Sequence, residues 1–428
     1  MKFQHICVIG LGYIGLPTAS MFARNGIRVT GVDNNAQVVE SLRQSKVHIY
    51  EPGLNDVVRE VLHDGSLQIA SYPTEADAFI IAVPTPFYDD KKADLSYVRA
   101  AAESIVPVLR PGNLVVLEST SPPLTTRDVV KPILEKSGLK AGSDFLLAYS
   151  PERVLPGQIM KELVENARVI GGIDEASAQA GSDLYKVIVK GEIVLTDATT
   201  SEMVKLMENT YRDVNIAIAN EFSRLAERFG VDIWEAVAIA NRHPRVRILN
   251  PGPGVGGHCI SVDPWFLVES APDITPLIHT ARVVNDGQPG FVLSTLKELL
   301  PDLRGRRIAV LGLAYKPDVD DLRESPAIEV AHLLVKEGAV VKAYEPFRPD
   351  YPLEGVTMTT SLADTLVDAE ILLLLVGHAQ FTALDPLEVA KLTPARLVLD
   401  TVNGWQREVW NLAGFRVEKL GDRKNSPR

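Results

Sequence analysis

The amino-acid sequence predicts an α/β protein with two doubly wound sheets joined by a long central helix. Continuous apolar runs, typical of buried parallel strands, alternate with helical patterns between residues 6 and 149. The pattern of Ile6 to Tyr13 returns at Ile308 to Tyr315. Between these regions, residues 200–229 contain neither Pro nor Gly and repeat apolar side chains at helical spacing, which predicts a helix of roughly 45 Å.

The length of 428 residues is sufficient for about three domains. The patterns above place the boundaries at the ends of the long helical section. The predicted segments are residues 1–198, 199–303 and 304–428.

Composition limits the function classes. Hydrophobic residues make up 46% and charged residues 23%, as in ordinary globular enzymes. The net charge of −11 argues against nucleic-acid and anionic-membrane partners. No apolar run approaches 18 residues, and the start lacks a secretory signal pattern. With only Cys7 and Cys259, neither a disulfide framework nor a metal site is expected, and we predict a cytoplasmic location. We expect disorder at residues 421–428.

The first strand leads into a glycine-rich turn. Residues 6–9 form a short apolar run, and Gly10, Gly12 and Gly15 follow it in the Gly-x-Gly-x-x-Gly pattern before a predicted helix. The second strand ends at Asp33, 18 residues beyond Gly15. Such a turn lets a pyrophosphate approach the backbone, and an acidic residue at this spacing accepts hydrogen bonds from a ribose. The pattern favours NAD over NADP, and the alternative is a turn that is merely rich in glycine.

Three further strands end in polar turns. The runs at 78–83, 114–117 and 145–149 are followed by Thr85, by Thr120 and by Ser-Pro-Glu152. In doubly wound sheets the ligand crevice lies at these carboxyl ends. Glu152 is therefore a candidate site residue, and the alternative is a helix-capping or surface glutamate.

The long helix and the segment after it contain polar candidates. Lys205 and Asn209 lie one turn apart on one predicted helix face, where the alternative is a solvated surface. The basic cluster at 242–247, which includes Arg245, suits an anionic ligand, although such clusters are usually solvated.

A loop containing four glycines precedes Cys259. Residues 251–257 combine glycines and prolines, and Asp263 follows the cysteine by four residues. Glycine permits positive φ and close backbone approach, so the loop is suited to presenting Cys259 to a ligand. The alternative is a buried cysteine behind an ordinary turn.

The second sheet begins with an altered turn. Ala314 occupies the place that corresponds to Gly12, and Pro317 occupies that of the third glycine. The dinucleotide pattern is therefore lost, while Lys316 and Arg323 provide cations for a different phosphate-bearing ligand.

Together these features are suited to one type of reaction. A thiolate can attack an aldehyde, and the thiohemiacetal can lose a second hydride to give a thioester, which water hydrolyses. Alcohol oxidation alone needs no cysteine, so the sequence indicates a four-electron oxidation of a primary alcohol. Two alternatives are a two-electron hydroxy-acid or sugar-phosphate dehydrogenase, and a catalytically silent protein that binds a nucleotide sugar.

The chain resembles the UDP-glucose/GDP-mannose dehydrogenase family over nearly its whole length. The motifs that carry the resemblance are Gly10 to Pro17, Ser150 to Glu152, Lys205 to Asn209, the Gly-Gly-x-Cys loop, Gly312 to Lys316, and Arg323 to Ser325. The resemblance implies two Rossmann-like domains, one for NAD and a C-terminal one for a UDP-sugar, with a helical dimerisation domain between them.

The resemblance also implies roles for single residues. Cys259 is the expected nucleophile, Lys205 and Asn209 hold the oxyanion, and Asp263 assists proton transfer. Glu152 is the expected base for thioester hydrolysis, and Thr120 orders water. The implied cofactor-binding residues are Gly10, Gly12, Tyr13, Ile14, Gly15, Asp33, Thr85, Thr120 and Arg323. The implied substrate-binding residues are Arg153, Lys205, Asn209, Arg245, Gly256 and Lys316.

Two positions bear on the sugar. UDP-glucose-specific members usually have Lys before the Asp after the cysteine loop and a second Glu after Ser-Pro-Glu, whereas this chain has Val262 and Pro156. The motifs within residues 243–266 resemble instead those of members that act on UDP-N-acetyl-D-mannosamine, and the resemblance implies oxidation at carbon 6 to the uronate, with UDP-N-acetylglucosamine and UDP-glucose as alternatives. The resemblance further implies a homodimer in which an arginine, which we assign to Arg245, reaches the partner's substrate.

Overall fold

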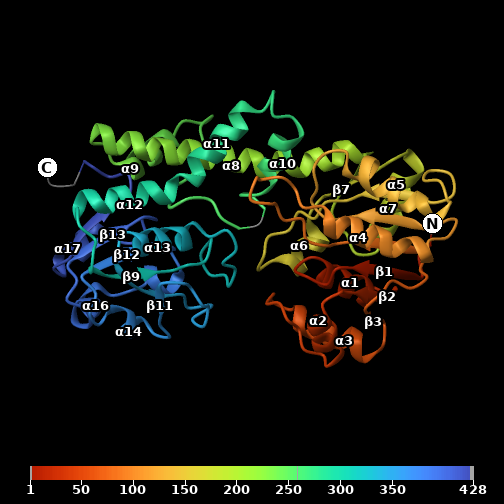
Figure 1. The fold of residues 1–428 in the computed structure, drawn as a ribbon, viewed down its shortest axis with the longest axis horizontal. Helices are drawn as coiled ribbons and strands as arrows, with labels where there is room; N and C mark the ends of the chain where they lie inside the picture. The colour runs from red at the N-terminus through yellow and green to blue at the C-terminus, as the bar shows by residue number, and fades with distance from the viewer. Residues whose placement is uncertain (1, 258, 425–428) are drawn as a thin grey trace. The chain divides into compact units, whose positions relative to one another are not determined.

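The computed structural model describes residues 2–257 and 259–424. The chain divides into two compact units (Figure 1). Unit 1 consists of Met1–Glu208 and Trp265–Ile274, and unit 2 consists of Asn209–Pro264 and Thr275–Arg428. Each unit contains one sheet with helices on both faces, which confirms the predicted α/β class with two doubly wound domains.

The sheet of unit 1 has eight strands in the order β3-β2-β1-β4-β5-β6-β7-β8. All neighbouring strands are parallel except β6 and β7, which are antiparallel. The strands are β1 (His5–Ile9), β2 (Arg28–Val32), β3 (Leu67–Ala70), β4 (Ala78–Ile81), β5 (Leu114–Leu117), β6 (Leu146–Tyr149), β7 (Arg168–Gly172) and β8 (Ile193–Asp197).

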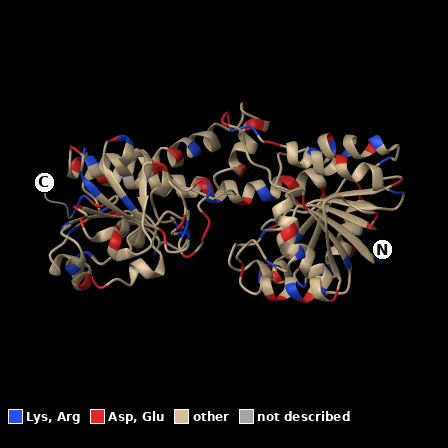
Figure 2. Ribbon diagram, turned by 60° about the horizontal axis from the view of Figure 1, so that its bottom comes forward, with Lys and Arg blue, Asp and Glu red and all other residues tan. Residues whose placement is uncertain are grey.

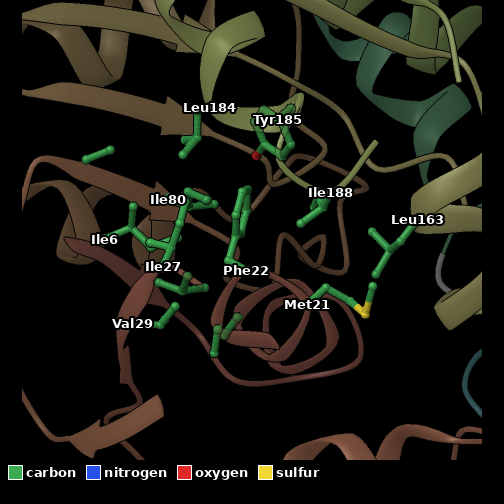
Figure 3. Close-up of a cluster of buried hydrophobic side chains, with 14 of the residues drawn as sticks. Ile6, Met21, Phe22, Ile27, Val29, Ile80, Leu163, Leu184, Tyr185 and Ile188 are labelled. Carbon is green, nitrogen blue, oxygen red and sulfur yellow. The ribbon is translucent and has the colours of Figure 1, made fainter. Parts of the chain in front are cut away.

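Helices cover both faces of this sheet. The helices within unit 1 are α1 (Gly15–Arg24), α2 (Ala36–Arg43), α3 (Leu54–His63), α4 (Ser96–Ile105), α5 (Lys131–Leu134), α6 (Ile159–Glu165) and α7 (Glu175–Tyr185). Side chains alternate along β1, so that Ile6 and Val8 pack with α1, α3, α6 and α7, while Cys7 and Ile9 pack with α4 and α5. Figure 3 shows part of the first of these two cores, in which the Tyr185 ring lies beside Phe22 with ring centroids 5.6 Å apart.

The sheet of unit 2 has six parallel strands in the order β11-β10-β9-β12-β13-β14. The strands are β9 (Arg307–Leu311), β10 (Val340–Tyr344), β11 (Val356–Met358), β12 (Ile371–Leu374), β13 (Leu397–Asp400) and β14 (Arg416–Lys419). Helices α12 and α13 cover one face, and α14 to α17 cover the other. The helices within unit 2 are α9 (Ile233–Ala240), α11 (Pro276–Asp286), α12 (Gln288–Leu299), α13 (Pro326–Lys336), α14 (Leu362–Leu366), α15 (Ala379–Thr382), α16 (Pro386–Leu392) and α17 (Arg407–Leu412).

The predicted long helix is present as α8 (Ala198–Phe229). It contributes residues to both units, because the division falls between Glu208 and Asn209. Helix α10 (Asp263–Ser270) likewise contributes to both. The three-segment division at residues 198 and 303 stays a prediction.

The expected disorder at 421–428 is wrong for its first four residues. The backbone N–H of Gly421 donates to Glu227 at 2.9 Å, and Asp422 forms an ion pair with Arg407 at 2.6 Å. Asn425 to Arg428 lie outside the described residues. Elsewhere, Lys and Arg residues are interspersed with Asp and Glu along the helices of each unit (Figure 2). None of the helices in the described ranges is long and apolar enough to cross a membrane.

Candidate functional site

The turn after β1 has the geometry of a dinucleotide cradle. Gly10 has φ +94°, and a Cβ on Gly15 would lie 1.8 Å from the Gly10 carbonyl oxygen, so neither position accepts a side chain. A Cβ on Gly12 would meet nothing within 4 Å. Gly12 therefore leaves open space at the exposed turn, which is what a pyrophosphate against the backbone requires.

The start of α1 and the end of β2 complete this cradle. Among the described residues, no side chain caps the N-terminus of α1 at Ile14, so its first amide groups can serve an anion. Asp33 directly follows β2, and its carboxylate accepts from the N–H of Leu11 at 3.0 Å and of Asn35 at 2.8 Å. Half-buried Asp33 is thus fixed beside the turn. These residues fit NAD, and half-buried Tyr13 lies in the same turn.

The ends of β4 and β5 bring two further predicted residues together. The Thr85 hydroxyl donates to the Thr120 carbonyl oxygen at 2.6 Å. The Ser119 hydroxyl accepts from the Val83 N–H at 2.9 Å and donates to its carbonyl oxygen at 2.7 Å, which joins the two strand ends. Thr85 and Thr120 therefore lie together at the carboxyl edge of the sheet.

Glu152 follows β6, as predicted, but its main partner was not foreseen. Arg168, at the start of β7, donates to the Glu152 carboxylate at 2.7 Å and to the Glu118 carboxylate, which follows β5. The hydroxyl of Tyr185 in α7 donates to Glu118 at 3.0 Å. Burial and the charge of Glu152 raise the pKa of Glu118 to about 7 against the opposing effect of Arg168.

Lys205, Asn209 and Arg153 lie on or beside α8. The side chains of Lys205 and Asn209 are buried, which excludes the solvated-surface interpretation. The guanidinium of Arg153 donates to Glu208 at 3.1 and 2.5 Å and to the Ala167 carbonyl oxygen at 3.0 Å. Arg153 is therefore held by protein groups one helical turn from Lys205.

The cysteine loop packs against the first turn of the second sheet. A Cβ on Gly256 would lie 2.5 Å from the Glu324 carbonyl oxygen, and one on Gly257, which has φ +81°, would lie 2.8 Å from the Tyr315 ring. Burial, then the charges of Asp321 and Cys259, raise the pKa of Tyr315 to about 12. The glycines are therefore needed for this close packing beside Cys259.

Cys259 and Asp263 are joined through the backbone. The Cys259 carbonyl oxygen accepts from the N–H of Asp263 at 2.8 Å and of Val262 at 3.1 Å. The Asn209 side-chain amide donates to the Asp263 carboxylate at 2.5 Å. The half-buried Cys259, together with buried Asn209 and Asp263, thus forms one cluster within unit 2. Cys7, in contrast, is buried in β1, and burial raises the pKa of its thiol to about 12.

A pocket of about 340 Å³ lies at the carboxyl ends of β9, β12 and β13. Its lining includes Pro253 and Gly254 of the cysteine loop and Tyr315 and Lys316 of the turn. The Lys316 ammonium lies 5.7 Å from the centre of the Tyr315 ring. Arg323, predicted at the cofactor, forms an ion pair with Asp321 at 2.6 Å, and Arg245 is exposed.

The site residues thus fall into two sets, one in each unit. Unit 1 holds the glycine turn, Asp33, Thr85, Thr120, Glu152, Arg153 and Lys205, and unit 2 holds Asn209, Arg245, Gly256, Cys259, Asp263, Lys316 and Arg323. Prediction from sequence missed Glu118, Arg168 and Tyr185. One signal was available, because Glu118 is the first residue after a buried strand.

Comparisons with known proteins match this arrangement. Family models match residues 4–189 as an NAD binding domain, 199–287 as a central domain and 309–407 as a UDP binding domain. A Methanocaldococcus jannaschii protein named UDP-N-acetyl-D-mannosamine dehydrogenase is 47% identical over 99% of this chain and 98% of its own. A Ralstonia solanacearum protein named NDP-N-acetyl-D-galactosaminuronic acid dehydrogenase is 47% identical over 95% and 97%.

A solved structure agrees with the sequence relatives. The UDP-D-ManNAc dehydrogenase of Pyrococcus horikoshii is 40% identical, with a TM-score of 0.92 over 98% of this chain and 100% of its own. The cofactor is NAD, and the chain is a nucleotide-sugar dehydrogenase. It belongs to the UDP-glucose/GDP-mannose dehydrogenase family.

Proposed function

We propose that this enzyme oxidises carbon 6 of UDP-N-acetyl-D-mannosamine from the primary alcohol to the carboxylate. The observation that carries the proposal is the cluster of Cys259, Asn209 and Asp263 behind a glycine loop that lines the pocket of unit 2. A simple alcohol dehydrogenase needs no such thiol. NAD, when bound, accepts a hydride in each of the two oxidations.

Cys259 forms the covalent intermediates. Its thiolate adds to the carbonyl carbon of the aldehyde, and the resulting thiohemiacetal becomes a thioester when its C–H hydride leaves. Lys205 and Asn209 stabilise the negative oxygen, and Asp263 accepts or returns the proton. The 2.5 Å hydrogen bond between Asn209 and Asp263 supports this assignment, since it holds Asn209 against Asp263, which follows Cys259 by four residues.

Glu152 directs the last step, in which water attacks the thioester. A C–O bond forms, the C–S bond breaks, and Cys259 leaves as thiolate while the water proton passes to Glu152. Thr120 orders this water. Overall, one alcohol, two NAD⁺ and one water give one carboxylate, two NADH and three protons.

The UDP moiety belongs in the pocket beside β9, β12 and β13. The match of residues 309–407 to a UDP binding domain supports this placement, as does Lys316 in the pocket wall. Lys316 supplies a cation for a phosphate, and the backbone of Gly256 permits close approach of the substrate. We assign Arg153 to the sugar end and Arg323 to the cofactor.

The identity of the sugar is the part that most needs a test, because relatives at 47% identity carry two different names. Purified enzyme would be given UDP-N-acetylmannosamine, UDP-N-acetylglucosamine, UDP-N-acetylgalactosamine and UDP-glucose in turn. NADH absorbance and product mass would be measured. We expect UDP-N-acetylmannosamine to turn over fastest and to yield two NADH per uronate without free aldehyde. One NADH per substrate, or faster turnover of UDP-glucose, would contradict the proposal.

The nucleophile is tested in the same assay with Cys259→Ser and the control Cys7→Ala. The serine hydroxyl is far less acidic than the thiol, so turnover should fall by about three orders of magnitude or more while NAD binding and melting stay close to wild type. Cys7→Ala should melt earlier, because it creates a cavity in β1, yet retain turnover. Retained turnover in folded Cys259→Ser would exclude the nucleophile role.

We further propose a homodimer formed through α8 and α9. These helices leave an apolar groove of about 250 Å³, and Phe222, Leu225 and Phe229 along it are 38%, 43% and 71% exposed. Apolar area of this kind is typical of an interface between subunits. A second copy is the proposed occupant, because the family resemblance implies an arginine reaching the partner's substrate and Arg245 lies in the loop directly after α9.

Hybrid dimers test this arrangement. Cys259→Ala and Arg245→Ala subunits are each inactive if both residues are required, but a mixed dimer contains one complete site. Partial recovery of turnover on mixing is expected. If hybrids form and no activity returns, Arg245 is not shared. We also propose a cytoplasmic location, because a thiolate nucleophile is maintained in a reducing compartment.

A further inference from the structure

A buried arginine links two carboxylates behind the carboxyl edge of the unit 1 sheet. Arg168 is 4% exposed, and its guanidinium donates to Ser150, Glu152 and Glu118. The same guanidinium lies 3.8 Å from the centre of the Tyr185 ring. Each of its three nitrogens donates to a protein group, which makes the orientation of this buried guanidinium specific.

Glu152 is fixed at both oxygens by this arrangement. Its Oε2 accepts from Arg168 at 2.7 Å, and its Oε1 accepts from the backbone N–H of Arg153 at 2.7 Å. The Glu152 side chain is 9% exposed. The neighbouring Arg153 guanidinium is occupied by Glu208, so Arg168 is the guanidinium that orients Glu152.

Glu118 is the less expected member of the cluster. Its side chain is fully buried, one oxygen accepts from Arg168 and Tyr185, and Oε2 has no hydrogen-bond partner among the described residues. One arginine cannot neutralise two buried carboxylates, so a proton on Glu118 is the way to make the cluster neutral. Burial, the opposing charge of Arg168 and the like charge of Glu152 together set the pKa of Glu118 at about 7.

We propose that Arg168 and Glu118 are positioning residues for Glu152 in thioester hydrolysis. Arg168 sets the direction of the Glu152 carboxylate. Glu118 competes for the same guanidinium, so that Arg168 does not pair with Glu152 alone. This inference rests on the proposed function, because it concerns the step in which Cys259 is released.

The charged groups around Glu152 make the direction of the pH effect definite. These groups are Arg168 on β7, Glu118 after β5, Tyr185 on α7, and Arg153 with its partner Glu208. Below about pH 7 Glu118 is neutral and does not compete with Glu152 for the charge of Arg168. Above that pH Glu118 is negative and competes for Arg168, so hydrolysis should accelerate.

Two variants test the two roles. Arg168→Lys keeps the positive charge but loses the planar guanidinium, which donates to several acceptors at once. Glu118→Gln keeps the shape of the side chain but is neutral at every pH. Both should slow hydrolysis by about ten to a hundredfold, as expected for a base that is displaced by a fraction of an ångström or paired more tightly with Arg168. The two hydride steps should change little.

Rapid mixing with UDP-N-acetylmannosamine and NAD separates these steps. Each variant should show a burst of two NADH per site, then slow turnover, with an acyl adduct on Cys259 detected by mass. Glu152→Gln is the positive control and should behave in the same way. Glu118→Gln should also lose any rise in the hydrolysis rate near pH 7.

Glu51→Gln serves as the structural control. Glu51 is also a buried carboxylate of unit 1, but it accepts only from the backbone N–H groups of Gly157 and Ile159 in the described contacts, at 2.8 and 2.7 Å. The Glu51→Gln variant should have a lower melting temperature but should show no burst of NADH. If Arg168→Lys and Glu118→Gln also melt earlier but slow all steps equally, or leave turnover unchanged, the positioning role is wrong.

Failure of the proposed function would look different. In that case the Glu152→Gln control itself would accumulate no adduct, or the wild type would release one NADH per substrate. An adduct in Glu152→Gln but in neither Arg168→Lys nor Glu118→Gln would overturn this inference and leave the proposed function intact.

Discussion

The two sheets begin with the same turn, and the comparison separates what the turn needs for folding from what it needs for NAD. Gly10 after β1 and Gly312 after β9 have φ of +94° and +89°. A Cβ would lie 2.4 Å from the Ala82 carbonyl oxygen in the first turn and 2.5 Å from the Val376 Cβ in the second. The first glycine is therefore a requirement of the turn itself, whichever ligand the domain binds.

The next two positions differ between the sheets. Open space surrounds Gly12, whereas its counterpart Ala314 carries a buried methyl group. Helix α1 starts directly at Gly15, while Pro317 stands at the equivalent place and α13 starts only at Pro326. The side chain of Ser325 caps α13 by accepting from the Ala327 N–H at 3.2 Å. The second turn has therefore lost both the space and the uncapped helix start that serve a pyrophosphate.

The acidic residue after the second strand of each sheet also differs in its role. Asp33 and Glu345 both accept from the first turn, through the N–H groups of Leu11 and Leu313. Asp33 is half-buried, whereas Glu345 is fully buried and also contacts His378 at 3.1 Å. Asp33 is thus able to bind a ribose in unit 1, whereas Glu345 at the equivalent place in unit 2 is a structural group.

The largest effect is expected where the first turn meets its own helix. In Gly15→Ala, the new Cβ would overlap the Gly10 carbonyl oxygen at 1.8 Å, so the turn must open at a cost of about 3 kcal/mol or more. NAD binding should fall beyond about a hundredfold, and unit 1 should melt earlier. Isothermal titration and calorimetry would measure the two effects. Gly290→Ala, in open space within α12, is the control and should change neither.

A smaller and more selective effect is expected at Gly12. Gly12→Ala adds a methyl group where the protein has open space, so melting should stay unchanged while the NAD dissociation constant rises about tenfold, or about 1.4 kcal/mol. The reverse change, Ala314→Gly, should not create NAD binding, because α13 remains distant and capped. A Gly12→Ala enzyme that binds NAD normally would show that the turn is not the pyrophosphate site.

The parts of this architecture that sequence predicts are those encoded by neighbouring residues. The sequence predicted the β1 turn, Asp33, α8 and the glycine loop, because each depends on local spacing or on the backbone freedom of glycine. Strands β7 and β8 were missed; β8 consists of exposed and half-buried positions only and lacks a long apolar run. The antiparallel pairing of β6 with β7 has no local signal at all.

The buried ionic groups show the same limit at the level of the site. Glu118 and Arg168 are 50 residues apart, and their contact depends on which strands become neighbours. Glu345 and His378 are 33 residues apart and meet for the same reason. Sequence therefore identified Glu152 as a candidate but could not identify the groups that orient it.

Changing Asp33 should have a moderate effect on cofactor choice. Asp33→Ala loses the ribose acceptor and the repulsion of a 2′-phosphate, so NAD should bind about tenfold more weakly and the preference over NADP should shrink. Asp33→Asn is the matched variant, because it keeps an acceptor for the Leu11 N–H while it removes the charge. Dissociation constants for both cofactors would be measured. Equal constants for NAD and NADP in the wild type would contradict the assignment.

The smallest effect concerns two buried carboxylates whose pKa values move in opposite directions. Burial alone would raise the pKa of Glu345, but hydrogen bonds from His378, Leu313 and Phe347 outweigh it and lower the pKa below 4.5. This carboxylate therefore stabilises the fold above its unfolded pKa of 4.5, and that contribution is lost as pH falls through the folded value.

Glu118 should behave in the opposite way. Its pKa is raised from 4.5 to about 7, so the folded state holds the proton more tightly, and the fold loses stability as pH rises from 4.5 to about 7. Melting curves of Glu345→Gln and Glu118→Gln between pH 4 and 8 test this contrast. Relative to wild type, Glu345→Gln should be most destabilised above pH 5 and recover at lower pH. Glu118→Gln should gain relative stability as pH rises and level off above about 7, because the wild type alone must bury the ionised carboxylate. Parallel pH profiles for the two variants would show that the acids share one environment, contrary to the difference between the two sheets.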